Sequence, residues 1–75
     1  MRKIYEIAAD IGYNWKNVSP YAKPYLDAMY SLENINEKYF LDSARSVVLY
    51  FLANAQGFRG EEARRLKAEL KAMAS

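Results

Sequence analysis

The chain has 75 residues and a formal net charge of +2, and it contains neither cysteine nor histidine. This composition excludes a disulfide framework, a thiolate nucleophile, a histidine general base and a Cys/His zinc site. Hydrophobic residues make up 52% of the sequence, which is enough to build a core. The length and the near balance of charges predict one domain over residues 1–75 that neither coats nucleic acid nor mimics it.

The N-terminal segment predicts the compartment. Arg2 and Lys3 resemble the basic start of a signal peptide, but Glu6 and Asp10 interrupt the apolar stretch that would have to follow. The longest nearly apolar run, 47–53, is far shorter than the about 20 residues that cross a bilayer. We therefore expect a soluble cytoplasmic protein that does not bind a membrane.

The first predicted helix covers roughly residues 2–11. Its apolar residues fall at the spacing of one helical stripe, namely Ile4, Ile7, Ala8 and Ile11. Gly12 follows at once, and glycine is favoured just after a helix end. Residues 13–19 are then expected to form a loop.

The second predicted helix covers roughly residues 20–32. Ser19 before Pro20 is a typical start, since the hydroxyl caps the helix and proline lacks a donor that would go unused. Pro24 disfavours a helical Lys23, so the alternative is a short turn at 20–22 followed by a helix from near Lys23.

The third predicted helix, roughly 35–55, is the most apolar and is expected at the centre of the fold. Asn34 and Glu37 have the spacing of a capping box at its start. Asp42-Ser43 is an alternative cap that would split this segment near Leu41.

The fourth predicted helix begins at Glu61, after a turn over 56–60. Its apolar positions recur at spacings of three, four and three residues, at Ala63, Leu66, Leu70 and Met73. No segment alternates with period two, so no strand is predicted. The predicted fold is all-α, a compact bundle of about four helices.

Catalysis finds little support in the sequence. Without histidine, acid–base work would fall to carboxylates, lysine or tyrosine, and the carboxylates are scattered along polar helix faces. Glu6 and Asp10 are four residues apart, but two carboxylates alone make a weak metal site. A glycine-rich phosphate loop is also missing. We predict no enzymatic activity, no cofactor and no metal.

The aromatic content is the most unusual feature, with 7 tyrosines, 3 phenylalanines and Trp15 in 75 residues. Tyrosine is enriched at binding hot spots, whereas Trp15 is interpreted as the lid of the core. The predicted function is a non-enzymatic protein–protein interaction module. Its contact surface is predicted to comprise Tyr21, Lys23, Tyr25, Asp27 and Tyr30.

The alternative function is a small nucleic-acid-associated regulator that uses the basic C-terminal helix. Its candidate residues are Arg59, Arg64, Lys67 and Lys71. Glu61 and Glu62 at the helix start and the interleaving of arginines with acids weigh against this alternative. Convergence of the four cations on one acid-free face would favour it, whereas exposed aromatic residues clustered on the second helix would favour a protein partner.

Three stretches, 25–29, 48–55 and 58–67, resemble uncharacterised small helical proteins of bacterial phages and mobile elements. The resemblance covers most of the chain and carries over no functional residue. It implies an accessory protein that acts on a host protein, for example an inhibitor of a defence system. The sequence does not distinguish a monomer from a homodimer.

Overall fold

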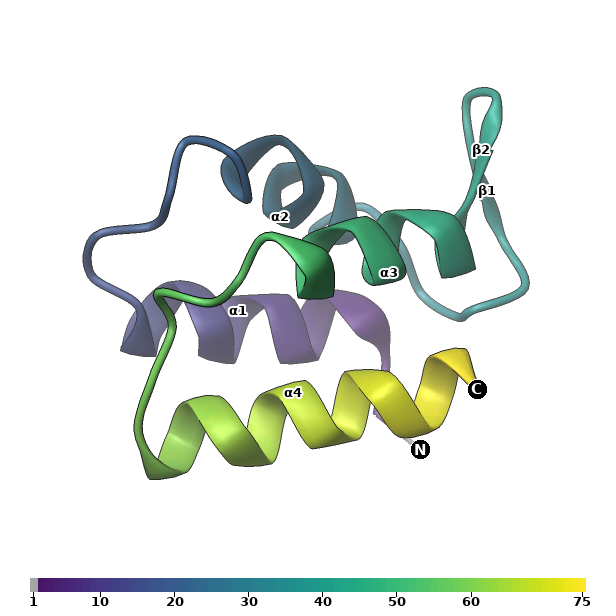
Figure 1. The fold of residues 1–75 in the computed structure, drawn as a ribbon. Coiled ribbons are helices and arrows are strands. Elements are labelled where there is room, and N and C mark those ends of the chain that lie inside the picture. The colour runs from purple at the N-terminus through teal and green to yellow at the C-terminus, as the bar shows by residue number, and fades with distance from the viewer. Residues whose placement is uncertain (1) are drawn as a thin grey trace.

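The computed structural model describes residues 2–75, which form a helical fold with one small hairpin. In chain order the elements are α1 (Ile4–Asn14), α2 (Lys23–Met29), β1 (Lys38–Tyr39), β2 (Asp42–Ser43), α3 (Ala44–Ala53) and α4 (Glu61–Ala74). The helix α4 packs against both α1 and α3, and α2 packs against α3 and α1. Figure 1 shows α4 running antiparallel to α1, so that the start of α1 and the end of α4 lie at the same side of the molecule. The prediction of a compact, mainly helical fold is confirmed.

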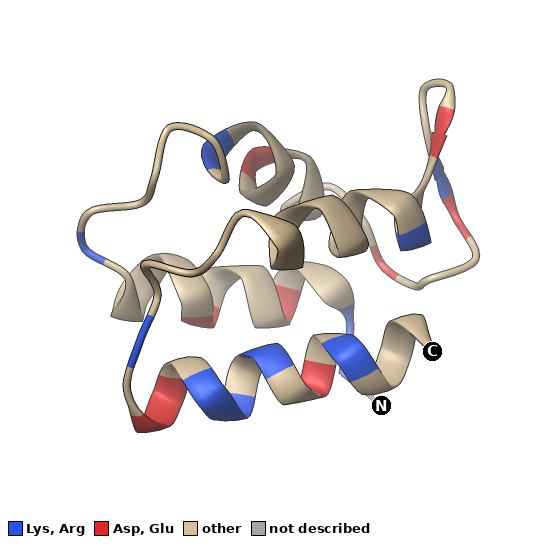
Figure 2. Ribbon diagram, in the orientation of Figure 1, with Lys and Arg blue, Asp and Glu red and all other residues tan. Residues whose placement is uncertain are grey.

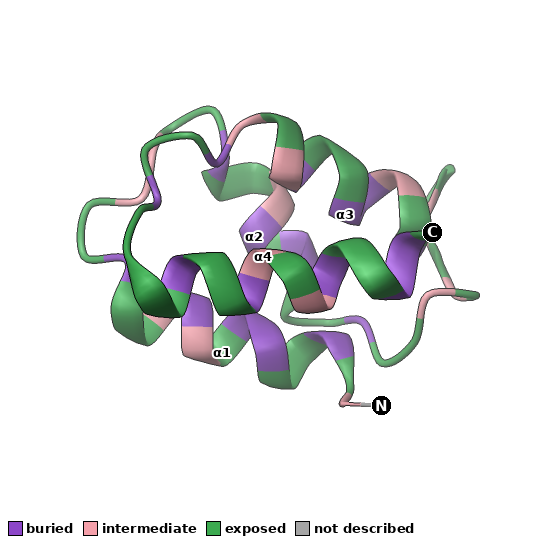
Figure 3. Cartoon of the chain, turned by 60° about the horizontal axis from the view of Figure 1, so that its bottom comes forward, coloured by how far each residue is buried: buried purple, intermediate pink, exposed green. Residues whose placement is uncertain are grey.

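One apolar core joins the four helices (Figure 3). The predicted stripe of α1 is fully buried, and so are Leu66 and Leu70 of α4. Phe51 of α3 lies at the centre with no exposed surface, and the ring of Trp15 meets it edge-on at 6.2 Å between centroids. Trp15 is itself buried, which confirms its interpretation as part of the core.

The helix α1 continues through Gly12 to Asn14, so the prediction that Gly12 ends the helix is wrong. Gly12 does not adopt a positive φ; among the described glycines only Gly60 does. A methyl group at Gly12 would overlap the hydroxyl oxygen of Tyr30. Glycine therefore stands here because Tyr30, directly after α2, comes close to the α1 backbone.

The helix α2 begins at Lys23, as the alternative that Pro24 suggested requires. The carbonyl of Ser19 accepts hydrogen bonds from Ala22 and Lys23, and this turn precedes the helix. The helix ends at Met29, earlier than predicted, although Leu32 beyond it is still buried in the core.

The third predicted helix is wrong over residues 35–43, and the alternative start at Ser43 is confirmed. Ser43 caps α3, since its hydroxyl accepts a hydrogen bond of 3.0 Å from the Ser46 backbone N–H. The preceding residues form an antiparallel hairpin in which Lys38 pairs with Ser43 and Tyr39 with Asp42. The prediction that the chain has no strand is therefore wrong as well. Figure 1 shows the hairpin projecting from the start of α3.

Within the described part of the chain, no helix is long and apolar enough to cross a membrane. Buried charged or polar residues are also missing from this part, so the polar residues 42–46 do not form a buried ion pair. Arg45 instead donates a hydrogen bond of 2.6 Å from Nε to the carbonyl of Ala74 at the C-terminal end of α4. This contact places a cation where the helix dipole is negative.

Candidate functional site

Acidic and basic residues are interleaved along α4 (Figure 2), and their contacts separate them onto two flanks of the helix. On one flank Arg65 bonds to Glu62 at 2.9 Å, and Glu69 bonds to Arg2 at 2.8 Å. Arg2 also contacts Asp10 of α1 at 2.7 Å. The carboxylates of Glu62 and Glu69 therefore lie on the side of α4 that carries Arg65 and faces Arg2.

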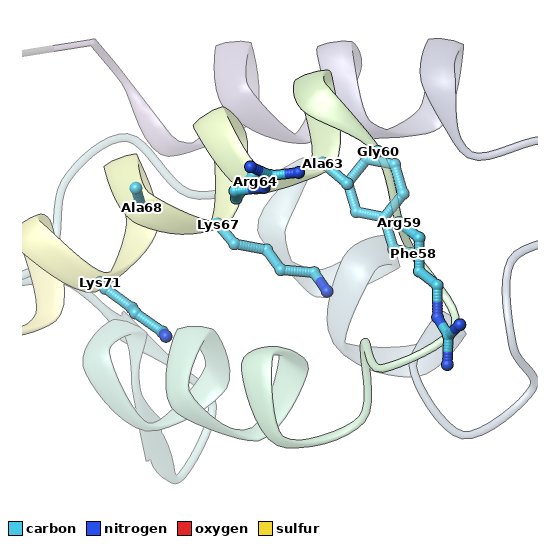
Figure 4. Close-up of a pocket in the computed structure, with 8 residues that line it drawn as sticks. All are labelled: Phe58, Arg59, Gly60, Ala63, Arg64, Lys67, Ala68 and Lys71. Atoms are coloured by element: carbon cyan, nitrogen blue, oxygen red, sulfur yellow. The ribbon is translucent and has the colours of Figure 1, made fainter.

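The other flank of α4 borders an open groove of about 420 Å³. The residues that line it are Phe58, Arg59, Gly60, Ala63, Arg64, Lys67, Ala68 and Lys71 (Figure 4). Figure 4 shows the side chains of Lys67 and Lys71 extending from the same side of α4. The lining contains no acidic residue. We call this site the basic groove.

The cations of the basic groove are not neutralised by protein carboxylates. None of the four forms an ion pair with another described residue, and Arg59 makes only a long 3.4 Å hydrogen bond to the carbonyl of Gln56. Burial, followed by the positive charges of Lys71 and Arg59, lowers the pKa of Lys67. The groove thus holds mutually repelling cations, an arrangement that a bound anion would stabilise.

The loop between α3 and α4 holds one end of the basic groove in place. Phe58 is buried and stacks on Trp15 with ring centroids 5.1 Å apart. The ammonium of Lys67 lies 5.8 Å from the Phe58 ring centroid, within the range of a cation–π contact. Gly60 has a φ of 110°, which glycine adopts without strain, and its carbonyl accepts the first hydrogen bond of α4 from Arg64. The apolar core, through Trp15 and Phe58, therefore fixes the position of this end of the groove.

The structure brings together the four basic residues that the sequence analysis named for the alternative function. Arg64, Lys67 and Lys71 share a helix face, and the loop places Arg59 beside them. The two acids at the helix start do not line the groove; Glu62 pairs with Arg65 on the opposite flank, and Glu61 is exposed. The arrangement meets the condition set for that alternative, namely convergence on an acid-free face.

Of the five residues predicted for a protein partner, the structure brings Lys23, Asp27 and Tyr30 together at one cavity. Lys23 and Asp27 are bonded at 3.3 Å and line a second cavity with Tyr30, between the end of α1 and α2. Tyr25 is half-buried and packs on Tyr50 of α3, with ring centroids 5.5 Å apart. Tyr21 lies before α2 and is 75% exposed.

One exposed feature was not predicted from the sequence. Phe40 and Leu41 form the tip of the hairpin and are 85% and 101% exposed. Phe40 has a φ of 56°, a conformation that bulky residues rarely adopt. The signal in the sequence was the pair of apolar residues directly before Asp42-Ser43, but these residues were included in the third predicted helix.

Comparison of the chain with protein-family models, with curated proteins and with solved structures gave no match. The resemblance to phage and mobile-element proteins therefore stays a prediction. Among the described residues, no three acidic residues gather in a group that could hold a metal ion.

Proposed function

We propose that the basic groove binds polyanions, with the sugar–phosphate backbone of nucleic acid as the ligand class. The observation that carries the proposal is the gathering of Arg59, Arg64, Lys67 and Lys71 on one groove without a carboxylate. Unpartnered cations on one face are the electrostatic footprint of phosphate recognition. The segregation of Glu62 and Glu69 to the opposite flank removes the competition that an internal acid would offer.

The length of the groove fits several neighbouring phosphates. An α-helix rises about 1.5 Å per residue, so Arg64 and Lys71 are separated by about 10 Å along α4. Arg59 extends the row beyond the helix start. Phe58 at the groove is buried against Trp15 and is not free to stack on a base. We therefore propose backbone contact with little sequence preference, because phosphate contacts position a protein without reading bases.

Anisotropy of a short fluorescein-labelled duplex, measured at several salt concentrations, tests this proposal. Four phosphate contacts predict a slope of log K against log salt no steeper than about −3.6. The double variant R64Q/K67Q should reduce the steepness by about 2 and weaken binding to duplexes of unrelated sequence alike.

The matched control is R65Q/K16Q, which removes the same charge from residues outside the groove. It should keep nearly the whole affinity, because its cations belong to the opposite flank and to the loop after α1. Equal losses in the two double variants would show that net charge alone attracts the duplex, and the proposed site would then be wrong.

A protein partner is the second candidate, and the hairpin tip is the observation that favours it. An exposed Phe40 at positive φ contributes nothing to the core, and glycine or asparagine would suit that backbone better. We propose that an apolar pocket of a host protein receives this tip, in line with the phage or mobile-element resemblance. This candidate is supported if the wild-type chain captures a host protein, F40S/L41S abolishes that capture and R64Q/K67Q preserves it. The reverse pattern would refute it.

A further inference from the structure

We propose that Lys67 is a site of covalent acylation by small acyl phosphates, which the basic groove captures through their phosphoryl group. The groove combines an amine set among apolar atoms with three further cations that recognise phosphate. The acylation requires only the groove itself. Its effect on nucleic acid rests on the function proposed above.

The position of Lys67 distinguishes it from the other lysines. Its side chain is half-buried beside Ala63 and Ala68, and its ammonium lies 5.8 Å from the Phe58 ring centroid. The neighbouring charges are all positive: Lys71 and Arg64 on α4, and Arg59 in the loop before it. Arg45 is the only charged residue of α3, which packs against α4. No carboxylate lines the groove to hold Lys67 in its ammonium form.

This setting makes Lys67 a better nucleophile near neutral pH. Burial and the charges of Lys71 and Arg59 lower the pKa of Lys67, so a larger fraction of its amine is neutral. Lys3 lies at the opposite extreme, since its hydrogen bond to Glu33 raises its pKa. Lys23 is held by Asp27 at 3.3 Å. Lys16 and Lys38 are exposed and form no ion pair with a described residue, so they serve as internal references.

The same groove is suited to the leaving group. Guanidinium groups of Arg59 and Arg64 and the ammonium of Lys71 match the charge of a phosphoryl dianion. In the reaction the neutral Lys67 amine attacks the carbonyl carbon, and a C–N bond forms as the C–O bond to the phosphoryl group breaks. Inorganic phosphate leaves with the bonding electron pair, and the proton of the amine passes to water. The products are an amide and phosphate, without any change in oxidation state.

Acylation would remove the charge of Lys67, which stands between Arg64 and Lys71 along the helix. It also leaves a neutral amide in a groove otherwise lined by apolar atoms and cations. Binding of a duplex to the acylated chain should therefore become weaker and less dependent on salt. The modification would act as a switch on the proposed binding site.

Two acylating reagents distinguish the nucleophilicity of Lys67 from capture of the phosphoryl group by the basic groove. The folded chain is treated with acetyl phosphate, or with the uncharged N-hydroxysuccinimide ester of acetic acid, and acetylation of each lysine is followed by mass spectrometry. With both reagents Lys67 should react several-fold faster than Lys16 and Lys38, and the preference should be larger with acetyl phosphate. Inorganic phosphate should slow the acetyl phosphate reaction more than the ester reaction, because it competes for the phosphoryl site.

Two variants complete the test, each checked for its helical content by circular dichroism. R59Q/R64Q should reduce the preference for Lys67 much more with acetyl phosphate than with the uncharged ester, for which only the loss of the Arg59 charge that favours the neutral amine slows the reaction. K71Q should slow Lys67 with both reagents, because it removes a charge that favours the neutral amine. The proposal is overturned if Lys67 reacts with acetyl phosphate no faster than Lys38, or if R59Q/R64Q leaves the preference unchanged. Either result stands whether or not the groove binds a duplex.

Discussion

Gly12 shows how one small residue sets the distance between two helices. It lies inside α1, where alanine would be more favourable by about 1 kcal/mol on helix propensity alone. The hydroxyl oxygen of Tyr30 occupies the place of the missing methyl group, whereas the ring carbon Cζ would lie at an ordinary 3.6 Å from it. The conflict therefore concerns a single oxygen atom.

The substitution Gly12→Ala should stabilise the chain only when that oxygen is absent. In the wild-type background the gain in helix propensity is offset by displacement of the Tyr30 ring, so G12A is expected to be near neutral or destabilising. In a Y30F background the same change should stabilise by up to about 1 kcal/mol. Urea unfolding of the four proteins measures the coupling. An equal effect of G12A in both backgrounds would show that the Tyr30 hydroxyl does not restrict this position.

The role of Gly12 was beyond reasoning from local sequence. Glycine after an apolar stripe most often marks a helix end, and nothing near residue 12 indicates that the tyrosine directly after the next helix approaches it. Trp15 was easier to interpret, because a lone tryptophan beside an apolar stripe usually belongs to the core. Its partner Phe58, which shapes the groove, is too distant in sequence to be inferred.

At the level of elements, residues 35–43 show a capping pattern used outside a helix. The Glu37 carboxylate accepts hydrogen bonds from the backbone N–H groups of Asn34 and Glu33, as the predicted capping box requires of its acid. The segment nevertheless turns, and the carbonyl of Glu37 accepts a hydrogen bond of 2.7 Å from Ala44 at the base of the hairpin. The same residues satisfy a turn as well as a helix start, so the spacing alone did not decide between them.

The substitution Ser43→Ala distinguishes a helix α3 that is capped by Ser43 from a continuous helix that begins at residue 35. With Ser43 as the N-cap of α3, loss of its hydroxyl should cost about 1 kcal/mol of stability, and Ser43→Asp should restore most of it. In a continuous helix from residue 35, alanine at position 43 would instead be neutral or stabilising. Thermal unfolding followed by circular dichroism distinguishes the outcomes. A stability of S43A equal to or above that of wild type would contradict the observed start of α3.

The helix α4 was predicted well because its signals are local. Its apolar spacing, its acidic first turn and its i, i+3 or i, i+4 charges all lie within the helix itself. Sequence reasoning therefore named Arg64, Lys67 and Lys71 as candidates on this helix, but it left open whether they converge on one face. The interleaved acids Glu62 and Glu69 fall on the other flank by the same helical spacing, and there they pair with Arg65 and Arg2.

At the scale of the molecule, Arg2 joins the first residues of the described chain to its last helix. It bonds to Glu69 of α4 through both Nε and Nη2, at 2.9 and 2.8 Å, and to Asp10 through Nη1. This cluster links α1 to α4, and it pairs Glu69, the acid in the later turns of α4, with Arg2.

The Arg2–Glu69 contact should make stability depend on pH in the acidic range. Hydrogen bonding to Arg2 lowers the pKa of Glu69 below its ordinary value of 4.5. A carboxyl group with a lowered pKa in the folded state stabilises the fold above its unfolded pKa, and this contribution is lost as the pH falls through the folded pKa. Because both side chains are partly exposed, we expect a contribution of about 1 kcal/mol or less.

Comparison of Glu69→Gln with Glu61→Gln across pH measures this contribution. At neutral pH, E69Q should melt below wild type, and the gap should close as the pH falls below about 4.5, the range in which Glu69 itself becomes protonated. E61Q removes an exposed acid that forms no ion pair with a described residue, so it should lose only the small contribution that a carboxylate makes at the positive end of the helix dipole. A gap between E69Q and wild type that persists unchanged into acid would show that the glutamine disturbs packing. The Arg2–Glu69 pair would then not be what joins α1 to α4.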